Sequence, residues 1–276
     1  MRKVRISMTI SPDLLKRIDS IVDGAQTRSR SEAIETVMSK FLEVNKTAVF
    51  LGGGDIERLL VGGKLKPLME IGERTLIEHN IEMLKKSGFR RIFIVGKSEL
   101  IGECFKVLGS GGRHGVKIDY LEEQRTLGNA KTLQIAEPHI NAPFLVLPVD
   151  NFFDFDLNYL STAHMQGGGI ATLAVQSGRE TRMDLGVVEM VGNRIISYEE
   201  APKNPKTFLT ATFIGMYSPE IFEYIPRGNA RWVLQTDVFQ KLIKEGKMNG
   251  CIVPGFYINV RDAGDVSLAR DFLKKK

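Results

Sequence analysis

The sequence predicts an α/β chain with two parts, a small β-α-α module over residues 1–45 and a larger three-layer α/β/α domain over residues 46–276. Residues 3–10 alternate apolar and polar side chains, as a half-exposed strand does. Two short amphipathic helical patterns follow. From Thr47 on, continuous apolar strands alternate with helices, which predicts a parallel sheet covered on both faces.

Composition allows one small and one medium domain in these 276 residues. Apolar residues make up 43% of the chain, which excludes global disorder and permits a sizeable core. The net charge is +5, and residues 1–46 hold nine Lys/Arg against six Asp/Glu. Positive charge is therefore denser at the N-terminal end, as a phosphate-contacting module requires, although an ordinary solvated surface would also account for it.

The cysteine pattern favours a reducing, cytoplasmic compartment. Cys104 and Cys251 are far apart and lack the spacing of a disulfide framework or a zinc site. The longest apolar runs, such as Phe144–Val149, are too short to span a membrane. The charged and then alternating N-terminus does not resemble a signal peptide.

The N-terminal module should need a second copy of itself. On its strand one face carries Val4, Ile6, Met8 and Ile10, and the other carries Lys3, Arg5, Ser7 and Thr9. Ser11-Pro12-Asp13 is typical of a helix start, and Ser29-Arg30-Ser31-Glu32 predicts a capping box that opens the next helix. One strand and two helices of this size cannot form a stable core alone, so we expect a partner strand from a dimer.

Residues 2–44 resemble the ribbon-helix-helix family of DNA-binding proteins through the runs Val4–Ile10 and Ser29–Ile34. The resemblance implies a homodimer whose two strands enter the major groove of double-stranded DNA, and it leaves open a tetramer made of two such dimers. It places Lys3, Arg5, Ser7 and Thr9 toward the bases, and the backbone amides near Ser29 and Arg30 toward a phosphate. The alternative is a dimerisation arm that binds no DNA.

The large domain opens with the apolar strand Ala48–Leu51, which runs into Gly52-Gly53-Gly54. Glycines let the backbone approach a phosphate, although a tight structural turn would use them too. Two familiar nucleotide patterns do not fit, because Glu57 stands where a dinucleotide fingerprint needs glycine and Leu65 follows Gly63-Lys64 where a P-loop needs Ser or Thr. A helix is expected over Leu76–Lys86, with strands over Arg91–Val95 and Phe144–Val149.

A third pattern resembles the sugar nucleotidyltransferase family, in the run Leu51–Leu59 followed by Lys66-Pro67-Leu68. Similar segments follow in the family's order as far as residue 273: Thr75–His79, Met83–Gly88, Leu127–Ala130, Leu145–Asp150, Gly186–Glu189, Glu200–Pro202, Thr236–Phe239 and Tyr257–Val260. The resemblance implies a Rossmann-like three-layer α/β/α nucleotidyltransferase domain. Its reaction joins a nucleoside triphosphate to a sugar 1-phosphate and releases pyrophosphate.

The resemblance also implies roles for particular positions. Arg58 and Lys66 match a catalytic basic pair, and Asp150 and Asn259 match the two ligands of a Mg²⁺ cofactor. Positions that contact the nucleotide are matched by Leu51, Gly52, Gly53, Gly54, Glu123 and Gly128, and positions that contact the sugar by Gly186 and Glu200.

Several ligand-facing positions depart from the family pattern. Ile56-Glu57 replaces Gly-Thr, Ala201 replaces a lysine, Asn259 replaces an aspartate, and Phe213 replaces a sugar-binding asparagine. Loss of such groups lowers rates by orders of magnitude. Two main hypotheses therefore stand: a DNA-binding sugar nucleotidyltransferase, or a transcriptional regulator whose degenerate domain senses a nucleotide or nucleotide sugar without turnover. An inert oligomerisation domain is a third.

Overall fold

The computed structural model describes residues 5–24, 27–44, 46–178 and 185–276, and for residues 39–44 the backbone alone. The chain divides into two compact units, residues 1–45 and 46–276, and each is described by itself. The expectations for Lys3 and Val4 lie outside the described residues.

The small unit contains the two expected helices, α1 (Pro12–Asp19) and α2 (Arg30–Val44). Ser11 caps α1 by accepting the amide of Leu14. At α2 the Ser29 hydroxyl accepts the Glu32 amide at 3.2 Å, whereas the Glu32 carboxylate accepts the Arg28 amide at 2.8 Å. The return bond of the predicted capping box is thus shifted by one residue.

In the described part of the predicted strand, residues 5–10, no strand is formed, because these residues carry no ladder hydrogen bonds. A strand requires a hydrogen-bonded neighbour, and this unit supplies none of its own among the described residues. The consequence is unusual exposure of apolar side chains, 67% for Ile6 and 47% for Met8.

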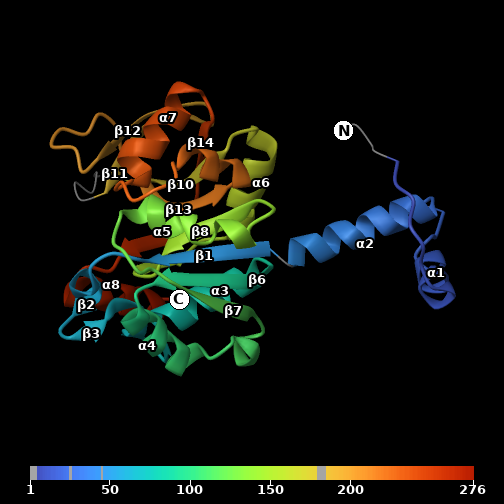
Figure 1. Cartoon of the computed structure of the whole chain (residues 1–276), viewed down its shortest axis with the longest axis horizontal. Helices are drawn as coiled ribbons and strands as arrows, with labels where there is room; N and C mark the ends of the chain where they lie inside the picture. The colour runs from blue at the N-terminus through green and yellow to red at the C-terminus, as the bar shows by residue number, and fades with distance from the viewer. Residues whose placement is uncertain (1–4, 25–26, 45, 179–184) are drawn as a thin grey trace. The chain divides into compact units, whose positions relative to one another are not determined.

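In the large unit, the described residues form a central sheet of nine strands in the order β10-β14-β12-β11-β13-β8-β1-β6-β7 (Figure 1). Their bounds are β1 (Lys46–Gly52), β6 (Phe89–Gly96), β7 (Lys117–Glu122), β8 (Phe144–Pro148), β10 (Ala171–Ser177), β11 (Gly186–Val191), β12 (Arg194–Glu200), β13 (Leu209–Tyr217) and β14 (Met248–Ile252). Strand β1 lies between parallel neighbours β6 and β8, and β7 continues the parallel half.

The other half of the sheet is largely antiparallel, so the expectation of a parallel sheet was wrong there. Strand β13 pairs antiparallel with β8, β10 and β11, and β11 with β12. Between β11 and β12 lie only Gly192 and Asn193, and a connection that short can join only antiparallel strands.

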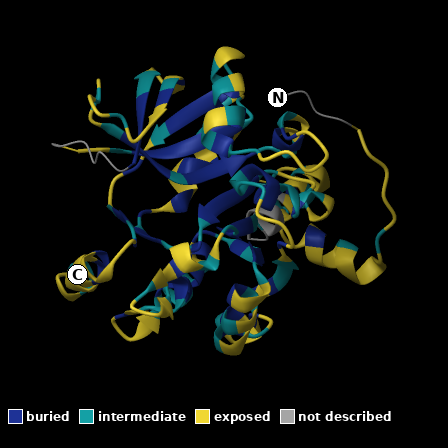
Figure 2. Ribbon diagram, turned by 60° about the vertical axis from the view of Figure 1, so that its left-hand side comes forward, coloured by how far each residue is buried: buried dark blue, intermediate teal, exposed yellow. Residues whose placement is uncertain are grey.

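Helices cover both faces of the sheet, which confirms the three layers. Along β1, Ala48 and Phe50 belong to one buried cluster, together with side chains of α3, α4 and α6. Val49 and Leu51 belong to the opposite cluster, together with side chains of α5 and α7. The covering helices are α3 (Leu76–Lys86), α4 (Ser98–Leu108), α5 (Asn129–Gln134), α6 (Leu157–Gly167) and α7 (Phe239–Lys244). In Figure 2 the strands between these helices are buried and the outer helix faces are exposed.

Smaller elements lie near the carboxyl end of β8. Strand β9 (Asn151–Asp154) pairs antiparallel with β15 (Phe256–Asn259), which brings Asn259 opposite Asn151. Two further hairpins are β2–β3 (Leu60–Val61, Lys64–Leu65) and β4–β5 (Glu70–Ile71, Arg74–Thr75), and the last helix is α8 (Ala263–Lys274). None of the described helices is long and apolar enough to cross a membrane.

Candidate functional site

A cavity of about 250 Å³ opens where β1 and β8 end. In α/β sheets this edge is the usual place for ligands. Six of the predicted site residues line it: Leu51, Gly53, Asp150, Gly186, Glu200 and Asn259. The fold therefore brings together side chains that are separated widely in the sequence.

The glycine turn after β1 needs each of its three glycines. A Cβ atom at Gly52 would collide with Leu100, and one at Gly53 would lie 2.5 Å from a carboxylate oxygen of Glu123. Gly54 has a φ of +100°, a conformation that L side chains rarely adopt. At Gly53 the turn thus presents bare backbone to the cavity.

Glu123 braces this turn from inside the protein. It is 2% exposed and does not line the cavity. One carboxylate oxygen accepts the amide of Gly54 at 2.7 Å, the other accepts the hydroxyl of Thr132, and Nζ of Lys97 lies 4.0 Å away. The expected base-contacting side chain is therefore engaged with the protein itself.

Lys66 and Asp150 form a buried ion pair beside the cavity, which Asp150 lines and Lys66 does not. The Lys66 Nζ and Asp150 Oδ2 atoms are 3.3 Å apart, and the two side chains are 10% and 17% exposed. Burial raises the pKa of Asp150, while the Lys66 ammonium lowers it. A hydrogen bond of 2.9 Å from the Val260 amide to the Asp150 carbonyl holds β15 against this end of β8.

Asn259 also lines the cavity, and its side-chain amide oxygen is a candidate metal ligand. Its Oδ1 atom is buried and has no hydrogen-bond partner among the described residues. Mg²⁺ favours oxygen ligands and commonly takes only one or two from protein while keeping several waters. The Asp150 carboxylate and the unpartnered Asn259 oxygen therefore fit a Mg²⁺ ion.

Arg58 is not brought to this pair. It belongs to a short 3₁₀ turn, Ile56–Leu59, and its side chain is 84% exposed. Its Nε atom lies 4.0 Å from Oδ2 of Asp55. It does not line the cavity. Ile56, where the family pattern has glycine, packs against the core beneath the turn.

Gly186 and Glu200 face each other in register at the paired ends of β11 and β12. The Tyr198 hydroxyl donates to Glu200 Oε2 at 2.6 Å, and it occupies the space into which a side chain at Gly186 would project. Tyr198 is 6% exposed, so its ring closes this end of the cavity.

Sequence reasoning missed several side chains of the cavity wall, among them Asn129, Tyr198, Gln235 and Tyr257. Asn129 was visible in the Leu-Gly-Asn-Ala turn. It donates to Gln235 Oε1 at 2.9 Å and accepts the Leu234 amide at 2.8 Å. Gly128, at a φ of +93°, lies against the carbonyl of Trp232 and does not line this cavity.

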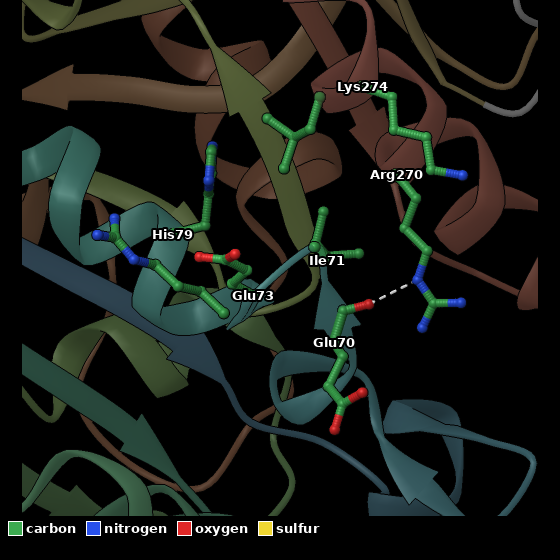
Figure 3. A pocket seen from close by; sticks show the side chains of 9 residues that line it. Glu70, Ile71, Glu73, His79, Arg270 and Lys274 are labelled. Atoms are coloured by element: carbon green, nitrogen blue, oxygen red, sulfur yellow. Dashed lines mark hydrogen bonds between the residues drawn. The ribbon is translucent and has the colours of Figure 1, made fainter.

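A wider cleft of about 730 Å³ lies between the β4–β5 hairpin and α8 and holds none of the predicted site residues. Figure 3 shows Arg270 reaching across to the backbone carbonyl of Glu70, at 2.8 Å, with His79 on the opposite wall. His79 stacks on Phe152 at 4.5 Å between ring centroids, and burial lowers the pKa of His79 to about 4. Its imidazole is therefore neutral at pH 7.

Comparison with known proteins gives a consistent result for the large unit. The protein-family model described as nucleotidyl transferase matches residues 47–266. The UTP–glucose-1-phosphate uridylyltransferase of Synechocystis sp. is 31% identical over 197 residues, which cover 66% of this chain and 50% of that protein. The glucose-1-phosphate thymidylyltransferase of Streptomyces antibioticus is 24% identical over 229 residues, which cover 80% of this chain and 63% of that protein. This chain thus spans about half to two thirds of these relatives.

Solved structures agree on the fold. A putative glucose-1-phosphate thymidylyltransferase from Bacillus anthracis, in complex with a sucrose, superposes with a TM-score of 0.74 at 26% identity, covering 84% of this chain and 96% of its own. A UDP-glucose pyrophosphorylase complexed with UDP-glucose has a TM-score of 0.67 at 17% identity, covers 84% of this chain and all of its own, and shows the fold alone.

Proposed function

The chain belongs to the nucleotidyl transferase family, and we propose that its large unit transfers a nucleotidyl group from a nucleoside triphosphate to a sugar 1-phosphate, releasing pyrophosphate. The observation that carries the proposal is the buried Lys66–Asp150 pair, whose Asp150 lines one cavity with Gly53 of the glycine turn and with Glu200. The relatives named above are themselves sugar-phosphate nucleotidyltransferases.

The reaction exchanges one phosphorus–oxygen bond for another. A phosphate oxygen of the sugar 1-phosphate bonds to the α-phosphorus, and the bond from that phosphorus to the oxygen shared with the β-phosphorus breaks. Pyrophosphate leaves with the electron pair. Negative charge grows on the oxygens around the α-phosphorus, so fixed cations stabilise the transition state.

Lys66 and the residues that line the cavity divide this work. Lys66 supplies a cation whose position is fixed by Asp150. Asp150 and Asn259 would hold Mg²⁺, which supplies further positive charge when bound. The glycine turn admits the triphosphate to the backbone, and Glu200, oriented by Tyr198, accepts hydrogen bonds from sugar hydroxyls.

The test is a pyrophosphate-release assay with each of the four nucleoside triphosphates, several sugar 1-phosphates and Mg²⁺. We expect turnover for at least one combination and its loss in Asp150→Ala. Asp271→Ala is the matched control, because Asp271 is an exposed carboxylate of α8.

A second candidate function is favoured by the exposed position of Arg58 and by the neutral Asn259. Here the large unit senses a nucleotide or nucleotide sugar without turning it over. Nucleotide binding in a calorimeter, without pyrophosphate release from any combination, would support this function over the enzyme.

We further propose that the small unit binds double-stranded DNA as a homodimer. Both expected helices form with their serine caps, and a bidentate ion pair from Arg30 to Asp19 joins them. Apolar side chains on the predicted strand segment, on both helices and in the turn after α1 are more than a third exposed: Ile6, Met8, Leu14, Val37, Met38 and, in the turn, Ile21. A second copy would cover them, and the exposed Arg5, Ser7 and Thr9 would then face the DNA.

Gel-shift titrations with genomic fragments test this part. Binding should weaken as salt rises and should weaken further in Arg5→Ala, while Lys16→Ala in α1 serves as the control.

Ile6→Asp should abolish dimers in light scattering, and the same measurement distinguishes a dimer from a tetramer. Adding the nucleotide sugar tests regulation, because coupled sites must change each other's affinity. Salt-insensitive or absent binding contradicts the DNA proposal.

A further inference from the structure

Strand β13 is interrupted by a bulge where it borders the cavity. Its antiparallel register with β10 breaks there, because Leu173 faces Gly215 but Val175 faces Ala211. Within the extra residues lies Phe213, with a φ of +62°. Glycine and asparagine enter this left-handed region readily, whereas a bulky side chain there is strained.

The surrounding structure fixes the bulge from both sides. The Thr212 hydroxyl donates to the Ala174 carbonyl at 3.0 Å and accepts the Ile214 amide at 3.2 Å. The side-chain amide of Asn151 donates to the Thr212 carbonyl at 3.1 Å. Thr212 and Asn151 are fully buried, so the strained conformation is imposed by the interior. Such outliers persist where they serve a site, and bulges beside active sites redirect side chains.

The redirected side chain of Phe213 lines the cavity together with Ala211, Leu185 and Tyr198. Its ring lies 6.1 Å from the ring of Phe239, and Tyr198 packs on the same ring at 5.6 Å, both between centroids. Because Phe239 is fully buried, it gives both aromatic side chains a rigid support. The wall beside Gly186 and Glu200 is therefore apolar and pre-formed.

We propose that Phe213 determines specificity, and that the sugar 1-phosphate accepted here is a deoxy sugar with an unhydroxylated carbon facing the Phe213 ring. This inference rests on the proposed transferase function. A hydroxyl against the ring would lose water without gaining a hydrogen-bond partner, whereas a C–H carbon or methyl group would gain apolar burial.

The experiment compares glucose 1-phosphate with its 2-, 3-, 4- and 6-deoxy forms under the triphosphate and Mg²⁺ conditions of the pyrophosphate assay. One deoxy form should exceed glucose 1-phosphate in kcat/KM by about 10- to 100-fold, the range that one apolar group confers in a pocket. In Phe213→Asn that ratio should fall to about one, because asparagine tolerates the left-handed conformation and supplies a hydrogen-bonding amide. Phe208→Asn is the matched control, since Phe208 is 58% exposed and lies outside the cavity.

The possible results separate the two proposals. Turnover by the wild type with no preference for any deoxy form overturns the role of Phe213 and leaves the transferase intact. The same holds if Phe213→Asn keeps the wild-type ratio, or if Phe208→Asn changes it equally. No turnover of any of these sugar phosphates by the wild type overturns both.

Discussion

The ammonium nitrogen of Lys66 lies 3.3 Å from Oδ2 of Asp150, joining two segments that are 84 residues apart in the sequence. Both side chains are largely buried, so each charge depends on the other. Removing one member of such a pair leaves an uncompensated buried charge. The contact therefore links the stability of the large unit to its proposed chemistry.

Lys66→Ala should affect both properties. We expect kcat to fall by about 100- to 1,000-fold, as for the loss of a preorganised transition-state group. The free energy of unfolding should fall by about 3 kcal/mol, because Asp150 stays buried without its partner. Lys64→Ala, at an exposed lysine of the β2–β3 hairpin that precedes Lys66, should change neither quantity. A kcat within twofold of the wild-type value would show that Lys66 does not act on the transferring phosphoryl group.

Asn259→Asp should strengthen metal binding, because a carboxylate is a better Mg²⁺ ligand than an amide oxygen. We expect the Mg²⁺ concentration for half-maximal activity to fall, and to rise in Asn259→Leu, which removes the oxygen. Mg²⁺ titrations of pyrophosphate release would measure both shifts. The same half-maximal concentration in all three proteins would place the metal elsewhere.

Glu123→Ala should loosen the glycine turn, since the Gly54 amide loses its acceptor and the Thr132 hydroxyl keeps only the Gly128 carbonyl, at 3.4 Å. An unsatisfied buried donor costs about 1–3 kcal/mol, which chemical denaturation can measure. The KM for the triphosphate should rise with it. Glu122→Ala, at the exposed neighbour, is the control. An unchanged KM in Glu123→Ala would mean that the turn does not contact the triphosphate.

His164 should make the large unit less stable in acid. It is 4% exposed, lies 3.0 Å from the hydroxyls of Thr172 and Ser218, and burial lowers its pKa from 6.5 to about 4. Between these values the unfolded chain binds the proton and the folded chain does not, so stability is lost as pH falls from 6.5 toward 4. At about 1.4 kcal/mol per pKa unit, the contribution is about 3 kcal/mol.

Denaturant unfolding at pH 7 and pH 4.5 measures this loss. In His164→Gln the free energy of unfolding should differ less between the two pH values than in the wild type. In His139→Gln, at an exposed histidine, this difference should equal that of the wild type. Half-buried His79 adds a loss of the same sign, so the difference should shrink without vanishing. An unaltered difference in His164→Gln would contradict the assignment.

Local patterns allowed much of the fold to be predicted. The bounds of α3 match the expectation from its apolar spacing, and β1 and β8 coincide with continuous apolar runs. The antiparallel half of the sheet could not be read in this way, because strand pairing depends on long-range partners. The missing N-terminal strand has the same cause, since its predicted neighbour belongs to another copy.

The sequence motifs predicted which residues belong to the candidate site better than they predicted what each side chain contacts. The family motifs assign a metal role to Asp150 and a sugar-binding role to Gly186 and Glu200; all three line one cavity, and their roles stay predictions. Arg58 has the expected motif position but lies outside the cavity. The Glu123 carboxylate accepts a hydrogen bond from the Gly54 amide instead of facing the cavity. Motifs do not specify where a side chain turns, nor do they reveal that a bulge holds Phe213 in a strained conformation.

The most direct measurement is pyrophosphate release by the full chain, with sugar 1-phosphates, each nucleoside triphosphate and Mg²⁺, beside the Asp150→Ala protein. The transferase account predicts release by the wild type that depends on the sugar phosphate and disappears in Asp150→Ala. Release that persists in Asp150→Ala, or no release by the wild type with any combination, would contradict it.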